Sequence, residues 1–282
     1  MDGFSATHLD IQPHEIVRFL LVESGQDKRD AVNVVDILNL LKLEYLSFDF
    51  DSALPEEARP GGKNPRALLS FPERVVATHS KLIEVRERFS ILHEVAHYIL
   101  PNHVKRFFLC DDAAIAGNSN LVLENEASVV AADLLFHGDR FTLEANSQPI
   151  TAATVKLLAD KYNASYEATA RRLAEKSLRP CMFLSFRREE ADESRINLDA
   201  KPIWRIRYCV GSPTFVARYF PRAQGTLSPE EAAALTQPGR DIAESITSEV
   251  PIKGPAGEDW RFWAEFFFNQ YNMFGLLTLA GT

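Results

Sequence analysis

Two histidines and a glutamate in the first half of the chain stand at the spacing of a zinc site. They belong to the sequence His93-Glu94-Val95-Ala96-His97, an H-E-x-x-H pattern. In an α-helix, residues four positions apart lie about 40° apart around the axis, so both imidazoles face one side and can bind one metal ion. Glu94 then lies beside the ion without binding it. The pattern predicts two histidines that hold Zn²⁺ and a carboxylate that takes a proton from water, as in zinc peptidases.

The residues around this pattern predict a helix that carries it. Residues 84–100 contain neither Gly nor Pro, and Phe89, Leu92, Ala96 and Ile99 recur at helical spacing. Pro101 ends the run. The alternative is a buried amphipathic helix whose histidines only form hydrogen bonds in the core. A glutamate between two histidines at this spacing favours the metal site.

A catalytic zinc site needs a third protein ligand, with the fourth position left to water. The helical run over residues 123–136 carries the candidates. Glu124 and Glu126 lie on opposite edges of its apolar stripe, so only one can face the metal, and periodicity does not choose between them. Asp133 falls on the same side as Glu126, where it is a candidate outer carboxylate that hydrogen-bonds a metal ligand.

The segments RFSILHEVAH (residues 88–97) and ENEASVVAADLL (residues 124–135) together resemble the ImmA/IrrE metallopeptidases. The pattern of that family is R-F-x-x-x-H-E-x-x-H followed by E-x-E-A-N/D-x-F-A-x-E-L-L-x-P. The resemblance covers roughly residues 10–180 and implies a gluzincin-like fold in which the glutamate before the alanine, here Glu126, is the third ligand. Ser128 stands where Asn or Asp is usual, and His137 replaces the customary Pro. Neither departure removes a ligand.

Residues 67–78 match the strand that precedes the metal helix in this family. We expect a strand or hairpin packed against that helix. In many zinc peptidases an edge strand beside the cleft pairs with extended substrate, and this segment is our candidate for that role. The alternative is an interior strand.

The composition is that of a globular protein, with 282 residues, 46% hydrophobic and 25% charged, long enough for two domains. The chain starts without a basic segment followed by an apolar one, and no stretch approaches the ~20 apolar residues of a membrane span. We therefore expect a cytoplasmic protein. The three cysteines, Cys110, Cys181 and Cys209, are widely separated and form no C-x-x-C, so the sequence suggests neither a disulfide frame nor a thiolate zinc site.

Residues 154–178 predict two short helices around Asn163-Ala164-Ser165, an arrangement that resembles a helix-turn-helix. Arg171 and Arg172 lie late in the second helix. Direct DNA binding is disfavoured, because the net charge of −8 supplies no basic surface for phosphate. The resemblance implies that this helical element belongs to the folded core.

We expect an α+β fold in two domains. Residues 1–190 would form a mainly helical, zincin-like peptidase domain with a small sheet, and residues 191–282 a smaller, β-rich mixed α/β domain. A charged segment over residues 187–200 predicts a solvated connection between them. Beyond it we expect hairpins over residues 202–220 and 259–279. Some family members carry a GAF-like sensor domain after the peptidase, and the alternative is a purely structural β layer.

These features predict a zinc endopeptidase with Glu94 as general base. Its zinc ligands would be His93, His97 and Glu126. The candidates for an oxyanion donor are Tyr98, His103 and His137. The resemblance implies as substrate a DNA-binding repressor of the helix-turn-helix type, cut to switch on a stress or mobile-element response. The alternatives are a non-proteolytic regulator with a structural metal, and a DNA-binding transcription factor.

Overall fold

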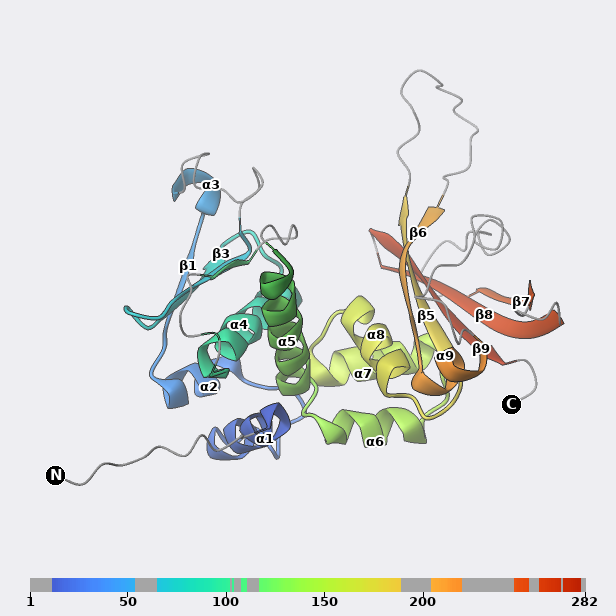
Figure 1. Ribbon diagram of the computed structural model, residues 1–282, viewed down its shortest axis with the longest axis horizontal. Coiled ribbons are helices and arrows are strands. Elements are labelled where there is room, and N and C mark those ends of the chain that lie inside the picture. Colours follow the sequence, from blue (N-terminus) through green and yellow to red (C-terminus); the bar gives the residue numbers. More distant parts are fainter. Residues whose placement is uncertain are drawn as a thin grey trace, which may run out of the picture. The chain divides into compact units, whose positions relative to one another are not determined.

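The computed structural model describes residues 12–53, 65–101, 103, 108–110, 117–188, 204–219, 246–253, 259–269 and 271–279. Helices dominate the first part of this described chain and strands the last part, which confirms the predicted α+β class (Figure 1). The chain forms two compact units, each described here by itself. Among the described helices, none combines the length and the apolar character that a membrane span requires.

The first unit combines helices with a four-stranded sheet (Figure 1). Its helices are α1 (Pro13–Glu23), α2 (Val34–Leu41), α3 (Phe50–Ala53), α4 (Glu84–Ile99) and α5 (Gly117–Leu135). Its strands are β1 (Glu44–Phe48), β2 (Ala67–Ser70), β3 (Val75–His79) and β4 (Phe108–Cys110). The strand order is β1-β3-β2-β4, and β1 and β3 are parallel while the other pairs are antiparallel. Helix α4 packs against β2, β3 and α5.

The hairpin predicted over residues 67–78 is present as β2 and β3. Of the two places that the sequence left open, edge and interior, the structure shows the interior one, because β3 lies between β1 and β2, and β2 lies between β3 and β4. Three consecutive residues of β3, Val76, Ala77 and Thr78, are buried, which is typical of a strand covered on both faces. Within the described part of this sheet, the edges are β1 and β4.

A small polar network ties the first turn of α4 to the sheet. The Tyr45 hydroxyl of β1 donates a hydrogen bond to Glu87 Oε1 at 2.5 Å and lies 2.7 Å from the Thr78 hydroxyl of β3. Burial and the neighbouring Glu87 carboxylate raise the pKa of Tyr45, so its hydroxyl keeps the proton that it donates. The network fixes the start of the helix that carries the two histidines.

Replacing Tyr45 by Phe should therefore destabilise the first unit by about 1 kcal/mol, because Glu87 loses a donor while the ring keeps its packing. Thermal unfolding monitored by circular dichroism measures this change. Tyr271→Phe is a matched control, because Tyr271 is 70% exposed. An equal melting temperature for Tyr45→Phe and the control would show that the network does not stabilise α4.

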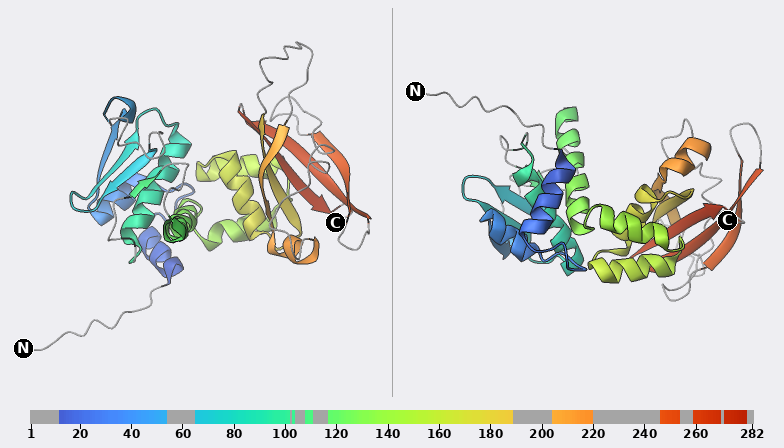
Figure 2. Two further views of the ribbon diagram at one scale, coloured as in Figure 1. Left: turned by 45° about the horizontal axis from the view of Figure 1, so that its top comes forward. Right: turned by 90° about the horizontal axis from the view of Figure 1, so that it is seen from below.

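The second unit contains a five-stranded antiparallel sheet with helices. Its strands, β5 (Cys181–Arg188), β6 (Trp204–Gly211), β7 (Ile246–Lys253), β8 (Asp259–Asn269) and β9 (Asn272–Leu279), have the order β6-β5-β9-β8-β7. They run side by side, from yellow to red, in both views of Figure 2. The hairpin predicted over residues 259–279 is confirmed as β8 and β9. Buried side chains from three strands and a short helix form an apolar core, among them Met182, Phe186, Phe215, Phe262, Phe266 and Leu277.

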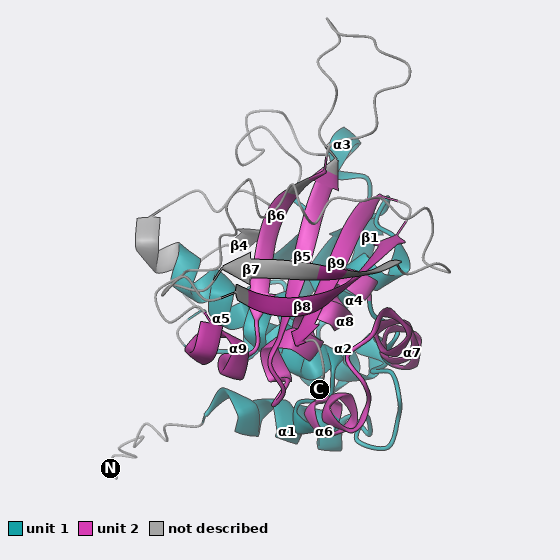
Figure 3. Ribbon diagram, turned by 90° about the vertical axis from the view of Figure 1, so that its right-hand side faces the viewer, with its two compact units in different colours: residues 1–140, 162–164 teal, residues 141–161, 165–282 magenta. Residues whose placement is uncertain are grey.

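The two units divide the chain before the predicted boundary at residue 190 (Figure 3). The first consists of Met1–Arg140 and Tyr162–Ala164, and the second of Phe141–Lys161 and Ser165–Thr282. Strand β5, which the sequence analysis missed, precedes residue 190 and pairs with both β6 and β9 inside the second sheet. Most of the predicted connection over residues 187–200 lies outside the described residues.

The hairpin expected over residues 202–220 is half correct. Strand β6 forms as predicted, but the following segment is a helix, α9 (Pro213–Tyr219). Pro213 occupies the first turn, and the Ser212 side chain accepts a hydrogen bond from the Phe215 backbone N–H at 3.2 Å. Serine followed by proline is a helix-start signal that outweighs the β-branched residues in this segment.

Two helices do form in the segment that resembles a helix-turn-helix, α7 (Ala152–Tyr162) and α8 (Tyr166–Lys176). Helix α8 packs on β5 and β6. Its Arg172 is only 3% exposed, and Arg171 Nε donates to Glu175 Oε1 at 2.7 Å. Both arginines expected late in the second helix are thus engaged within the unit. The remaining helix of this region, α6 (Asp139–Ser147), connects α5 to α7.

Candidate metal centre

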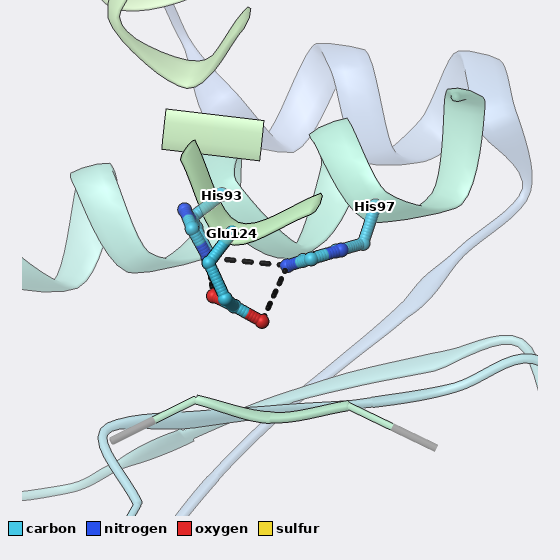
Figure 4. A group of neighbouring side chains, drawn as sticks. All are labelled: His93, His97 and Glu124. Atoms are coloured by element: carbon cyan, nitrogen blue, oxygen red, sulfur yellow. Dashed lines mark hydrogen bonds and ion pairs between the residues drawn. The ribbon is translucent and has the colours of Figure 1, made fainter. Parts of the chain in front are cut away.

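Three side chains from two neighbouring helices converge on one point in the first unit (Figure 4). His93 and His97 come from α4, and Glu124 comes from α5. The two Nε2 atoms lie 3.2 Å apart. Glu124 Oε2 lies 3.1 Å from His93 Nε2, and Glu124 Oε1 lies 3.5 Å from His97 Nε2.

These separations fit a tetrahedral metal ion. Ligand atoms bound at about 2.0–2.1 Å to one tetrahedral ion lie about 3.3 Å apart. The observed distances of 3.1, 3.2 and 3.5 Å scatter around this value. Two imidazoles and one carboxylate are also a donor set that zinc accepts in peptidases. The residues present therefore fit Zn²⁺.

The structure places Glu124, rather than Glu126, beside the two histidines. The family resemblance implied Glu126, and periodicity left both glutamates open. The Glu126 carboxylate points to the other edge of α5, where Oε2 lies 3.2 Å from His103 Nε2 and the side chain is 54% exposed. The two residues are two positions apart, about 200° around the helix, so one helix cannot present both to the same ion.

The protonation states at this site suit metal binding. Burial raises the pKa of the Glu124 carboxyl, but the neighbouring imidazoles of His93 and His97 outweigh it and hold that pKa far below its usual range. Burial lowers the pKa of His97, which keeps its imidazole neutral at pH 7. Zinc requires deprotonated ligands, and a carboxylate beside a neutral imidazole meets that requirement.

Each histidine has a partner for its second ring nitrogen. Ser128 Oγ lies 3.5 Å from His93 Nδ1, and Ser128 follows Glu124 by one turn of α5. His103 Nδ1 lies 2.8 Å from His97 Nδ1. The carboxylate that we expected in this outer position, Asp133, is nine residues beyond Glu124, about 14 Å along the helix. The observed partners are therefore Ser128 and His103, and not Asp133.

Glu94 is fully buried on α4. It lies about 100° around the helix axis from His93 and about 60° from His97. Glu94 thus lies next to the histidines but is not one of the three converging residues. The H-E-x-x-H spacing predicts this position for a general base. Glu94 therefore remains the candidate for proton transfer.

Two of the three residues considered as oxyanion donors contact other parts of the unit. The Tyr98 ring stacks on Phe71, with centroids 5.8 Å apart. His137 follows the end of α5, about 20 Å along the helix from Glu124, and its ring packs on Tyr162. The third, His103, contacts the ligand His97, with the two Nδ1 atoms 2.8 Å apart.

A second cluster of metal-binding residue types, Asp49, Asp51 and His79, lies in the first unit. Lys81 already supplies a cation there, because its Nζ lies 2.5 Å from Asp51 Oδ2 and 3.1 Å from Asp49 Oδ2. We do not assign a metal to this cluster.

Comparison with known proteins agrees with the fold and the motifs. Residues 56–174 match the Peptidase_M78 family model, described as the IrrE N-terminal-like domain. No curated protein matches the sequence significantly. The fold is similar to that of a Mycobacterium tuberculosis transcriptional regulator, with a TM-score of 0.55 and 15% identity over 95% of this chain and 75% of the other. Such low identity indicates a shared fold alone.

The matched region contains every residue of the candidate centre, from α4 to the middle of α5. This region also holds the two segments that resemble the ImmA/IrrE family. The match of residues 56–174 to the IrrE N-terminal-like domain therefore supports the resemblance to the ImmA/IrrE family.

Proposed function

We propose that the protein is a zinc-dependent endopeptidase. The observation that carries this proposal is the convergence of His93, His97 and Glu124 at separations that one tetrahedral ion requires. Glu94, buried beside them, gives the site a second carboxylate that the metal does not need. A purely structural zinc site would have no use for it.

In the proposed reaction, bound Zn²⁺ would act as a Lewis acid that acidifies a water molecule and polarises the substrate carbonyl. The Glu94 carboxylate accepts a proton from the attacking water and then donates it to the leaving amine. His93, His97 and Glu124 keep their positions throughout. Strand β4, at an edge of the described part of the same sheet, offers backbone groups with which an extended peptide can pair.

As substrate we propose a helix-turn-helix transcriptional repressor, cut to switch on a stress or mobile-element response. The ImmA/IrrE resemblance supports this class. A structural neighbour described as a transcriptional regulator is consistent with a role in gene regulation. A cytoplasmic location would place the enzyme together with such a repressor.

A second candidate is a non-proteolytic regulator that keeps the fold and the metal but acts by binding a partner. The fold is similar to that of a protein described as a transcriptional regulator, which is compatible with this candidate. Direct DNA binding has less support, since α8 packs on the second sheet and buries Arg172, and the net charge is −8.

Cleavage of a repressor separates these candidates. The zinc-loaded protein is incubated with the helix-turn-helix repressor encoded by a neighbouring gene and, as control, with an unrelated helix-turn-helix protein. We expect cleavage of the first alone, read by gel and mass spectrometry, and we expect a chelator to stop it and added Zn²⁺ to restore it. A stable complex in which the repressor stays intact would favour the non-proteolytic regulator.

A further inference from the structure

We propose that His103 and Glu126 are positioning residues, which together hold His97 in the one tautomer that can bind zinc. The inference rests on the proposed metal site and adds to it two residues that do not touch the ion. It also gives a role to the glutamate that the family resemblance had assigned as a ligand.

The geometry is a continuous line of three side chains. His97 directs Nε2 at His93 Nε2, 3.2 Å away, and at the Glu124 carboxylate. On the other side of its ring, Nδ1 lies 2.8 Å from His103 Nδ1. The second nitrogen of His103, Nε2, lies 3.2 Å from Glu126 Oε2. The line thus runs from the metal position through two imidazoles to a carboxylate on α5.

A neutral imidazole carries one N–H, so two facing Nδ1 atoms leave two possible arrangements. In the first, His97 Nδ1–H donates to His103 Nδ1, and His103 carries its own proton on Nε2. In the second, His103 Nδ1–H donates to His97 Nδ1, and His97 carries its proton on Nε2. Only the first leaves the lone pair of His97 Nε2 available for a metal ion.

Glu126 distinguishes these arrangements. Its carboxylate can only accept hydrogen bonds, so it stabilises a proton on His103 Nε2, which exists in the first arrangement alone. In the second, the carboxylate would face the lone pair of His103 Nε2. The carboxylate therefore selects the metal-binding tautomer of His97 through the intervening ring.

Burial explains why Glu126 acts on His97 through His103. The side chains of His97 and His103 are both 0% exposed, whereas the Glu126 side chain is 54% exposed. The charged group thus stays at the surface, where its solvation is retained, while its orienting effect reaches a buried ligand. His103 is the link between the two.

Zinc affinity and ring tautomers test the proposal in the full-length protein. The variants are Glu126→Ala, Glu126→Gln and His103→Gln, with Asn125→Ala, an exposed neighbour on α5, as matched control. Competition with a chromophoric chelator gives the Kd for Zn²⁺. We expect Glu126→Ala and His103→Gln to bind zinc about 10 to 100-fold more weakly than the control. Glu126→Gln should lose less, because its amide oxygen can still accept from His103 Nε2–H.

Imidazole ¹⁵N NMR spectra of the zinc-loaded wild type supply the second readout. We expect protons on His97 Nδ1 and His103 Nε2, and in metal-free Glu126→Ala a mixture of tautomers at both rings. A proton on His103 Nδ1 in the wild type would overturn the proposal. So would a Kd for Glu126→Ala equal to that of Asn125→Ala.

The variants also separate this inference from the proposed activity. If the Glu126→Ala and His103→Gln variants bind zinc more weakly but the wild type cleaves nothing, the positioning role of His103 and Glu126 is supported and the peptidase activity is refuted. If the wild type cleaves its substrate but Glu126→Ala binds zinc as tightly as the control, the peptidase activity is supported and the positioning role is refuted. A wild type that binds no zinc would refute both. Because Glu126 is half exposed, its variants should fold even if His103→Gln does not.

Discussion

Glu94→Gln should leave zinc bound and abolish peptide cleavage. The amide has the size of the carboxylate but cannot accept a proton at neutral pH, so the attacking water keeps its proton. Removal of a general base typically costs about 10² to 10⁴ in rate. Because Glu94 is not among the three converging ligand residues, the zinc content should stay at one ion per chain. Cleavage rates of a susceptible repressor, with zinc content measured on the same samples, check both statements.

Glu84→Gln is a suitable control for this experiment, because Glu84 is an exposed residue in the first turn of the same helix. It should retain full activity. If Glu94→Gln and wild-type proteins relieve repression equally well in cells, proteolysis is not the function. The partner-binding regulator would then be the better account of the same metal site.

Single substitutions of the proposed ligands should remove the metal. We expect His93→Ala, His97→Ala and Glu124→Ala to be purified without zinc, because each leaves two protein ligands in place of three. Glu126→Ala should retain a zinc ion at saturating metal, although it binds more weakly. Elemental analysis after dialysis at defined zinc concentrations distinguishes loss from weakening.

The comparison between the two glutamates is the informative part of that series. Glu124 and Glu126 are of the same type, on the same helix and two residues apart, so each is the matched control for the other. Zinc retained in Glu124→Ala and lost in Glu126→Ala would transfer the third ligand to Glu126. It would also show that α5 is rotated relative to α4 from the arrangement described here.

The sequence predicts the metal helix well, because every signal for it is local. Its start near Glu84, its end before Pro101 and the shared face of His93 and His97 follow from periodicity and from one helix breaker. The hairpin of β8 and β9 is equally local. Elements of this kind need no knowledge of the tertiary structure.

The choice of third ligand is a tertiary property. Periodicity places Glu124 and Glu126 on two edges of one stripe, but which edge meets α4 depends on how the two helices pack. His103 has no periodic signal, because it follows the end of α4. Its contact with His97 is visible only in three dimensions.

In the second unit, the missed features have a similar cause. Strand β5 is covered by α8 on the same sheet that it forms with β6 and β9, so its residues are buried without a regular polar alternation. Helix α9 depends on Ser212 and Pro213, a short start signal within a segment of strand-forming residues. For β5, burial beneath α8 removes the polar alternation that marks a strand. For α9, the short Ser-Pro start signal outweighs the pattern of strand-forming residues.

X-ray diffraction from crystals grown in the presence of Zn²⁺, measured on both sides of the zinc absorption edge, tests the metal site most directly. We predict one anomalous peak in the first unit, about 2.0–2.2 Å from His93 Nε2, His97 Nε2 and a carboxylate oxygen of Glu124. His103 and Glu126 should lie outside its coordination sphere. A peak bound by Glu126, or no peak between α4 and α5 in protein that elemental analysis shows to contain zinc, would contradict this account.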